Sequence, residues 1–170
     1  STTANGTANS TTANGTANSS TTNSTTPSAT TSQTINLAPA NAMTSKLNIT
    51  KDIFTVGTWN VKTLWATGKL ELLRNEMKRY KYDVIGISEV RWTGKGETSS
   101  GDFIYSGESN THTKGVGILL SAKARKLLLC YNPIDSRIIT ARFNATPFNV
   151  TIIHVYAPTA ESSEDEIESF

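Results

Sequence analysis

The sequence predicts an α/β fold, and three observations lead to it. Two short apolar runs, at residues 54–59 and 84–87, flank a stretch with helical periodicity. Five further short apolar runs follow between residues 103 and 156, close enough together to pair as antiparallel strands. Residues 1–45, by contrast, contain no charged side chain and almost nothing apolar to bury. We therefore expect one α/β domain over residues 46–170, preceded by a disordered tail over residues 1–45.

The predicted tail is repetitive and polar. Residues 1–18 are two copies of the nine-residue unit STTANGTAN, and a degenerate continuation runs to about residue 34. Such a tract cannot bury enough apolar surface to fold, so we expect it to be disordered. It also contains five Asn-x-Ser/Thr sequons, at Asn5, Asn9, Asn14, Asn18 and Asn23. A glycosylated stalk is one interpretation, but no secretory leader is visible and compositional accident is favoured. Residues 35–51 are expected to form a linker.

A strand, a helix and a second strand are predicted next. Apolar and polar residues alternate over residues 54–59, which indicates a strand. Over residues 68–80, apolar side chains recur at steps of three and four, which indicates one helical face, and residues 83–89 are again strand-like. A crossover of this length joins parallel strands. Asn60 and Glu89 follow the two strands, so both should emerge at one sheet edge, where an amide beside a carboxylate can hold a metal ion and a phosphate.

The rest of the chain is predicted to be mainly strands. A loop over residues 91–101 comes first, and the candidate strands then cover residues 103–106, 116–120, 127–131, 138–143 and 148–156. Short connections, such as Asn144 to Pro147, favour antiparallel hairpins, so the sheet should be mixed. Ser162 and Ser163, followed by three acids, indicate the start of a helix.

The body of the chain is basic. Residues 46–160 hold all 16 Lys and Arg side chains but only nine of the 14 acids, a net charge of +7 that the whole-chain value of +2 conceals. A basic body suits a polyanionic partner such as nucleic acid, and an ordinary solvated lysine-rich surface is the alternative.

The sequence also excludes several kinds of protein. Its single cysteine, Cys130, excludes an internal disulfide framework and a cysteine-based zinc site, and its apolar neighbours predict a buried thiol. No apolar run approaches the roughly 20 residues that a membrane span needs. The chain begins with Ser1 and no leader is visible, so we expect an excised or incomplete product.

Six short motifs resemble, in their order along the chain, the endonuclease/exonuclease/phosphatase superfamily. They read GTWNVKTLWATGKLE, DVIGISEVRWTGKGE, YSG, GVGILLS, SRIITARF and HVYAPT, and the resemblance covers residues 53–170. Within the superfamily, the sequence is most similar to the endonuclease domain of RTE-type non-LTR retrotransposons and to the craniofacial-development-protein-2-like products derived from them. The resemblance implies the N-terminal part of a four-layer α/β sandwich of the DNase I-like kind, with the site between two sheets.

The resemblance also implies roles for individual residues. Glu89 would bind Mg²⁺ or Mn²⁺, Asn60 would orient the catalytic groups and the scissile phosphate, and the Tyr156 hydroxyl would donate to that phosphate. Contacts with the phosphates of double-stranded DNA are expected, by position and charge, from Arg91, Lys95, Lys114 and Arg137. His154 is expected to be structural rather than a general base, and the implied location is the nucleus.

The sequence departs from the family pattern in two ways. Lys62 stands where the apurinic endonucleases of the superfamily carry an acid, and the Gly-Asp-x-Asn and Asp-His motifs that complete the family's site do not occur before Phe170. We therefore expect a truncated Mg²⁺-dependent, strand-nicking DNA endonuclease domain of a non-LTR retrotransposon that is inactive by itself. Two alternatives stay open: a non-catalytic DNA-binding or chromatin-associated derivative, and a phosphatase of the same superfamily.

Overall fold

The computed structural model describes residues 36–37 and 45–170, which form an α/β unit. The predicted fold class is confirmed, because the helices accompany sheets that contain both parallel and antiparallel strand pairs. The nine-residue repeats and the five sequons of the predicted tail lie outside the described residues. No helix in the described ranges is long and apolar enough to cross a membrane.

The larger sheet contains the predicted strand, helix and strand. β3 (Val56–Asn60) and β4 (Val84–Ser88) pair in parallel, and α1 (Lys69–Arg79) connects them. The strand order is β3-β4-β7-β6-β5, and the three remaining strands, antiparallel to their neighbours, are β7 (Val116–Leu120), β6 (Phe103–Ser106) and β5 (Lys95–Glu97). The parallel register places Asn60 opposite Ser88, so Glu89 leaves the sheet beside Asn60.

A second, four-stranded sheet is antiparallel throughout. Its order is β1-β8-β9-β11, and its strands are β1 (Asn36–Leu37), β8 (Leu128–Pro133), β9 (Ile138–Phe143) and β11 (Val150–Val155). A short parallel pair stands apart from both sheets and joins β2 (Leu47–Asn48) to β10 (Ala145–Thr146).

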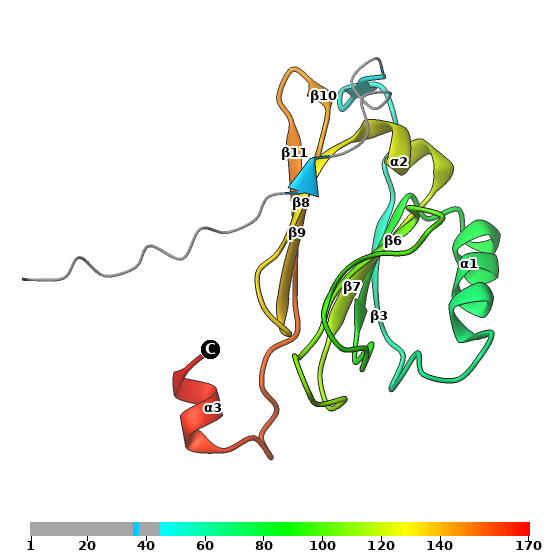
Figure 1. Ribbon diagram of the computed structural model, residues 1–170. Helices are drawn as coiled ribbons and strands as arrows, with labels where there is room; N and C mark the ends of the chain where they lie inside the picture. The colour runs from blue at the N-terminus through cyan, green and yellow to red at the C-terminus, as the bar shows by residue number, and fades with distance from the viewer. Residues whose placement is uncertain (1–35, 38–44) are drawn as a thin grey trace, which may run out of the picture. The chain divides into compact units, whose positions relative to one another are not determined.

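The two sheets and α1 make three of the four expected layers. Figure 1 shows α1 on one side of the larger sheet and the strands β8, β9 and β11 on its other side. Side chains of β6, β7 and β9 fill the space between the sheets, among them Ile104, Ile118 and Phe143. Leu73 and Met77 of α1 pack on the opposite face of the larger sheet. Every residue of β4 and β7 is buried, as expected for central strands covered on both faces.

Three parts of the fold differ from the sequence prediction. α2 (Ala122–Leu127) precedes β8 and contributes Ala124 and Leu127 to the core between the sheets, where a strand over 127–131 was expected. β5 lies within the predicted loop over 91–101, and β1 and β2 lie within the predicted linker. Cys130 is half-buried rather than buried, because its side chain lies on the outer face of the second sheet.

The predicted helix near the end of the sequence is present as α3 (Glu164–Glu168). Ser163 is its N-cap, and the Ser163 Oγ accepts a hydrogen bond from the Glu166 N at 3.3 Å. α3 follows a loop from β11 and lies to one side of the two sheets (Figure 1).

Candidate functional site

Asn60 and Glu89 meet at the edge of the larger sheet, as the sequence predicted. The Asn60 Nδ2 donates a hydrogen bond of 2.7 Å to the Glu89 Oε1. The Asn60 Oδ1 accepts from the backbone N of Lys62 at 3.0 Å, which fixes the orientation of the amide. Asn60 and Glu89 meet because the parallel pairing of β3 and β4 ends both strands at the same level.

Two further side chains donate to Glu89, and one of them comes from the second sheet. The Tyr156 hydroxyl, just after β11, donates to the Glu89 Oε1 at 3.2 Å. The Arg91 Nη2 donates to the Glu89 Oε2 at 3.0 Å. We call Asn60, Glu89, Arg91 and Tyr156 the Glu89 cluster. These donors lower the pKa of Glu89, Asn60 most strongly, while burial acts in the opposite direction. Burial and the nearby Glu89 charge raise the pKa of Tyr156.

The backbone around the Glu89 cluster adopts an unfavourable conformation. Lys62, Glu89 and Arg91 have φ values of 58°, 57° and 59°, in the left-handed region that residues with a Cβ rarely occupy. The loop before β7 holds this backbone in place, since the Arg91 N donates to the Lys114 O at 3.0 Å and the Val90 N to the Gly115 O at 2.9 Å. Such strain, of order 1 kcal/mol or more per residue, is typical of functional sites.

The predicted metal site at the Glu89 cluster rests on one carboxylate. Within residues 36–37 and 45–170, no group of three or more His, Cys, Asp or Glu side chains is placed to hold a metal ion. Glu89 is the single carboxylate of the Glu89 cluster, and both of its oxygens already accept hydrogen bonds, one of them from a guanidinium. Mg²⁺ favours carboxylate, water and phosphate oxygens in an open octahedral arrangement. Binding of Mg²⁺ or Mn²⁺ at Glu89 therefore stays a prediction.

Three of the four predicted DNA contacts lie near the Glu89 cluster. Arg91 belongs to it, and its side chain is 41% exposed. The Arg137 Nη1 donates to the Tyr156 O at 2.8 Å, and its guanidinium lies 5.1 Å from the centre of the Tyr156 ring. The Lys114 O accepts a backbone hydrogen bond from the Arg91 N. Lys95 has a different neighbour, because its Nζ donates to the Ile134 O at 2.6 Å, in the turn between β8 and β9.

The two histidines differ in burial. His154 is buried between the sheets, where its Nε2 lies 3.2 Å from the Ser88 Oγ and burial lowers its pKa. None of its described contacts is with the Glu89 cluster. His112, in a loop, places its Nδ1 2.9 Å from the Arg91 O and packs its ring 4.5 Å from that of Trp65. Trp65 is an exposed aromatic residue that was not among the predicted site residues.

Replacing Glu89 with glutamine should destabilise the protein at neutral pH by about 1–2 kcal/mol, because Arg91 loses its charged acceptor. The folded-state pKa of Glu89 lies below its ordinary value of 4.5, so the carboxylate contributes its full stability above that pH. That contribution is lost as the pH falls through the folded-state pKa. The free-energy difference between wild type and Glu89→Gln, measured by urea unfolding, should therefore shrink below pH 4.5. Glu164→Gln, on the exposed face of α3, is the control, and a difference that stays constant down to pH 3 would contradict the prediction.

Comparison with known proteins gives two relatives and no family. No protein-family model matches the chain. The chain is 39% identical over 128 residues to craniofacial development protein 2 of Bos taurus, and the matched segment covers 74% of this chain and 22% of the relative. It is 37% identical over 133 residues to craniofacial development protein 2 of Tragulus javanicus, and the matched segment covers 77% of this chain and 23% of the relative. The chain thus spans less than a quarter of the length of the curated relatives it matches.

These relatives correct the function predicted from the sequence. Both are named craniofacial development protein 2, and neither is named as a retrotransposon endonuclease. The assignment to the endonuclease domain of a non-LTR retrotransposon, and with it the function of a truncated strand-nicking endonuclease, is therefore wrong. The short motifs misled because they specify strands, turns and an Asn–Glu pair at a sheet edge, and such a scaffold does not fix one activity.

Proposed function

We propose that this part of the chain is a non-catalytic module that binds the phosphate backbone of double-stranded DNA. The observation that carries the proposal is that both oxygens of the Glu89 carboxylate already accept hydrogen bonds from protein side chains. Three donor side chains already satisfy this single carboxylate, and the Arg91 guanidinium keeps N–H groups beyond the one that it donates to Glu89. Groups of this kind position a phosphate, whereas hydrolysis also needs an activated water and a stabilised leaving group.

The charge of the surrounding surface supports the same proposal. Residues 46–160 carry a net charge of +7. Arg91 combines an exposed guanidinium edge with a buried Nε that has no hydrogen-bond partner among the described residues. An approaching phosphate oxygen would form a charge-assisted hydrogen bond with the exposed edge. The names of the two relatives also fit a non-catalytic derivative better than a nuclease. A nuclear location belongs to the proposal.

The test is the affinity for a fluorescently labelled DNA duplex of mixed sequence, measured by anisotropy at several salt concentrations. Binding through about three phosphates should give an affinity that falls with salt with a log–log slope near −3. Arg91→Ala should weaken binding by roughly threefold to tenfold and reduce the slope by about one. Arg79→Ala removes the same charge from the exposed end of α1 and should change affinity by less than about twofold.

Two results would contradict the proposal. One is undetectable or salt-insensitive binding of the duplex. The other is nicking of supercoiled plasmid in Mg²⁺ that persists through purification and disappears in Glu89→Ala, because it would show catalysis at the Glu89 cluster. Turnover of soluble phosphoesters with the same dependence on Glu89 would favour the phosphatase alternative.

A further inference from the structure

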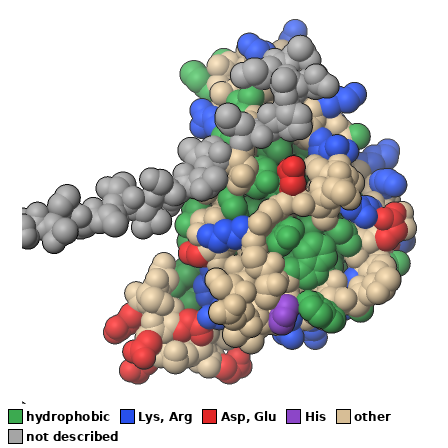
Figure 2. All heavy atoms as spheres, viewed as in Figure 1, with side chains coloured by type: hydrophobic (Ala, Val, Ile, Leu, Met, Phe, Trp, Pro, Cys, Tyr) green, Lys and Arg blue, Asp and Glu red, His purple; other side chains and the backbone are tan. Residues whose placement is uncertain are grey.

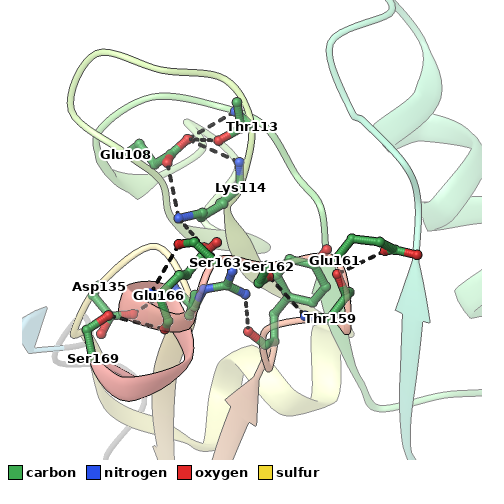
Figure 3. Close-up of polar contacts among 12 residues, drawn as sticks. Glu108, Thr113, Lys114, Asp135, Thr159, Glu161, Ser162, Ser163, Glu166 and Ser169 are labelled. Atoms are coloured by element: carbon green, nitrogen blue, oxygen red, sulfur yellow. Dashed lines mark hydrogen bonds and ion pairs between the residues drawn. The ribbon is translucent and has the colours of Figure 1, made fainter.

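The Glu166 carboxylate of α3 joins two of the predicted DNA contacts. The Lys114 Nζ and the Arg137 Nη2 both contact the same carboxylate oxygen, Oε1. The three residues come from separate segments, namely the loop before β7, the turn before β9 and α3. Figure 3 shows Lys114 between Glu108 and Glu166, with Glu166 on the ribbon of α3.

The two cations are held in place by contacts that do not involve α3. The Glu108 Oε2 accepts hydrogen bonds from the Thr113 N, the Thr113 Oγ1 and the Lys114 N, at 3.0, 2.8 and 3.1 Å, and so fixes the loop that carries Lys114. Arg137 donates to the Tyr156 O, and its guanidinium lies 5.1 Å from the centre of the Tyr156 ring. The Arg137 guanidinium and the loop that carries Lys114 are therefore held in place by contacts other than those with Glu166.

α3, in contrast, makes its described polar contacts with the rest of the fold through a single residue. None of its residues is buried, and Ile167 is half-exposed. In the described structure, every hydrogen bond or ion pair that links α3 to the two sheets passes through Glu166. Four of its five residues are acidic, and Figure 2 shows acidic side chains gathered over this helix. Salt screens ion pairs that solvent reaches, and 30% of the Lys114 side chain and 24% of the Glu166 side chain are exposed, so a competing anion can reach them.

A phosphate oxygen and a carboxylate oxygen can form the same interactions with Lys114 and Arg137. Both accept charge-assisted hydrogen bonds from a lysine ammonium and an arginine guanidinium. The pair lies beside the Glu89 cluster, since Tyr156 contacts both Arg137 and Glu89. Lys114 and Arg137 lower the pKa of Glu166 to about 2, so the carboxylate stays charged at neutral pH.

We infer that Lys114 and Arg137 form a phosphate-binding site that Glu166 occupies until a phosphate displaces it. α3 is then an internal competitor, and binding at this site requires its release. The identity of the ligand as a DNA phosphate rests on the function proposed above, whereas the competition between Glu166 and phosphate does not. Because only the fraction of molecules with α3 released can bind, removing the competitor raises the apparent affinity.

The first experiment compares the full chain with the variants Glu166→Gln and Glu168→Gln for duplex DNA binding by anisotropy. Both variants remove one acid from α3, but only Glu166 contacts the two cations. Glu166→Gln should bind roughly threefold to tenfold more tightly than wild type, and Glu168→Gln should change affinity by less than about twofold. Lys114→Gln added to Glu166→Gln should cancel the gain.

The second experiment uses sodium pyrophosphate alone and follows the backbone amide NMR signals of Glu166 and Ile167. Pyrophosphate should shift these signals toward those of a free segment, and sodium chloride at matched ionic strength should do so less. If DNA binds to none of the proteins but pyrophosphate releases α3, the proposed function fails and this inference stands. If DNA binds equally to wild type and both variants and pyrophosphate leaves the amide signals unmoved, the inference is overturned and the proposed function stands.

Discussion

Gly86→Ala is expected to destabilise the protein by about 2–3 kcal/mol, because the two sheets are packed too closely there for a methyl group. A Cβ at residue 86 would lie 2.3 Å from the Nδ1 and 2.7 Å from the Cγ of His154. The imidazole cannot move away easily, since it is buried and its Nε2 is engaged by the Ser88 Oγ. Thermal unfolding should show a midpoint lower by roughly 8–15 °C.

Gly96→Ala is the matched control. It also lies in a strand of the larger sheet, but its nearest neighbour would be the Tyr105 hydroxyl oxygen at an ordinary 3.6 Å. The double variant Gly86→Ala, His154→Ala tests the cause, because removing the ring should remove the clash. Its stability should be no lower than that of His154→Ala alone, a coupling typical of residues in contact. A Gly86→Ala protein that melts within about 1 °C of wild type would show that the sheets can separate at this point.

Elements with strong apolar periodicity could be predicted from the sequence. α1 falls where helical apolar spacing placed it, and the strands β4, β6, β7 and β9 fall where short apolar runs placed them. β5 could not be predicted in this way, since Lys95–Glu97 has no apolar residue and pairs on one side only. α2 is six residues long, too short for a helical period to emerge. Its detectable signal was Ser121, an N-cap whose Oγ accepts from the Ala124 N at 3.1 Å.

The candidate site was predictable to the extent that it depends on local sequence. Asn60 and Glu89 could be paired because each follows a strand of one parallel pair. The role of Glu166 could not be predicted, because it lies 52 residues from Lys114 and 29 from Arg137 and belongs to a helix whose acids resemble ordinary first-turn residues. Their contact arises from the path of the loop after β11, which has no periodic pattern. Charge and position in the sequence were therefore enough to select Lys114 and Arg137, but not to predict that Glu166 contacts both.

The exposed edges of the two sheets are expected to make the protein self-associate. β3 and β11 each end a sheet, and both edges lie on the same side, because β11 packs over β4 and β7 while β8 packs over β6. Large apolar side chains of these two strands are exposed, namely Val56, Trp59, Ile153 and Val155. Unpaired strand edges with apolar side chains are templates for pairing with another chain. Sedimentation velocity should therefore show an average mass that increases with protein concentration.

Ile153→Lys should weaken this association by roughly tenfold to a hundredfold, which corresponds to losing the burial of one isoleucine, about 1.5–3 kcal/mol. Ile153 is 62% exposed and points away from the core, so the variant should keep the melting temperature of wild type. Leu72→Lys is the control, because Leu72 is similarly exposed but lies on the outer face of α1. Equal weakening by both variants would indicate general apolar stickiness rather than pairing at the sheet edges. A wild-type protein that stays monomeric at every concentration would mean that strand pairing at these edges is too weak to offset the entropy of association.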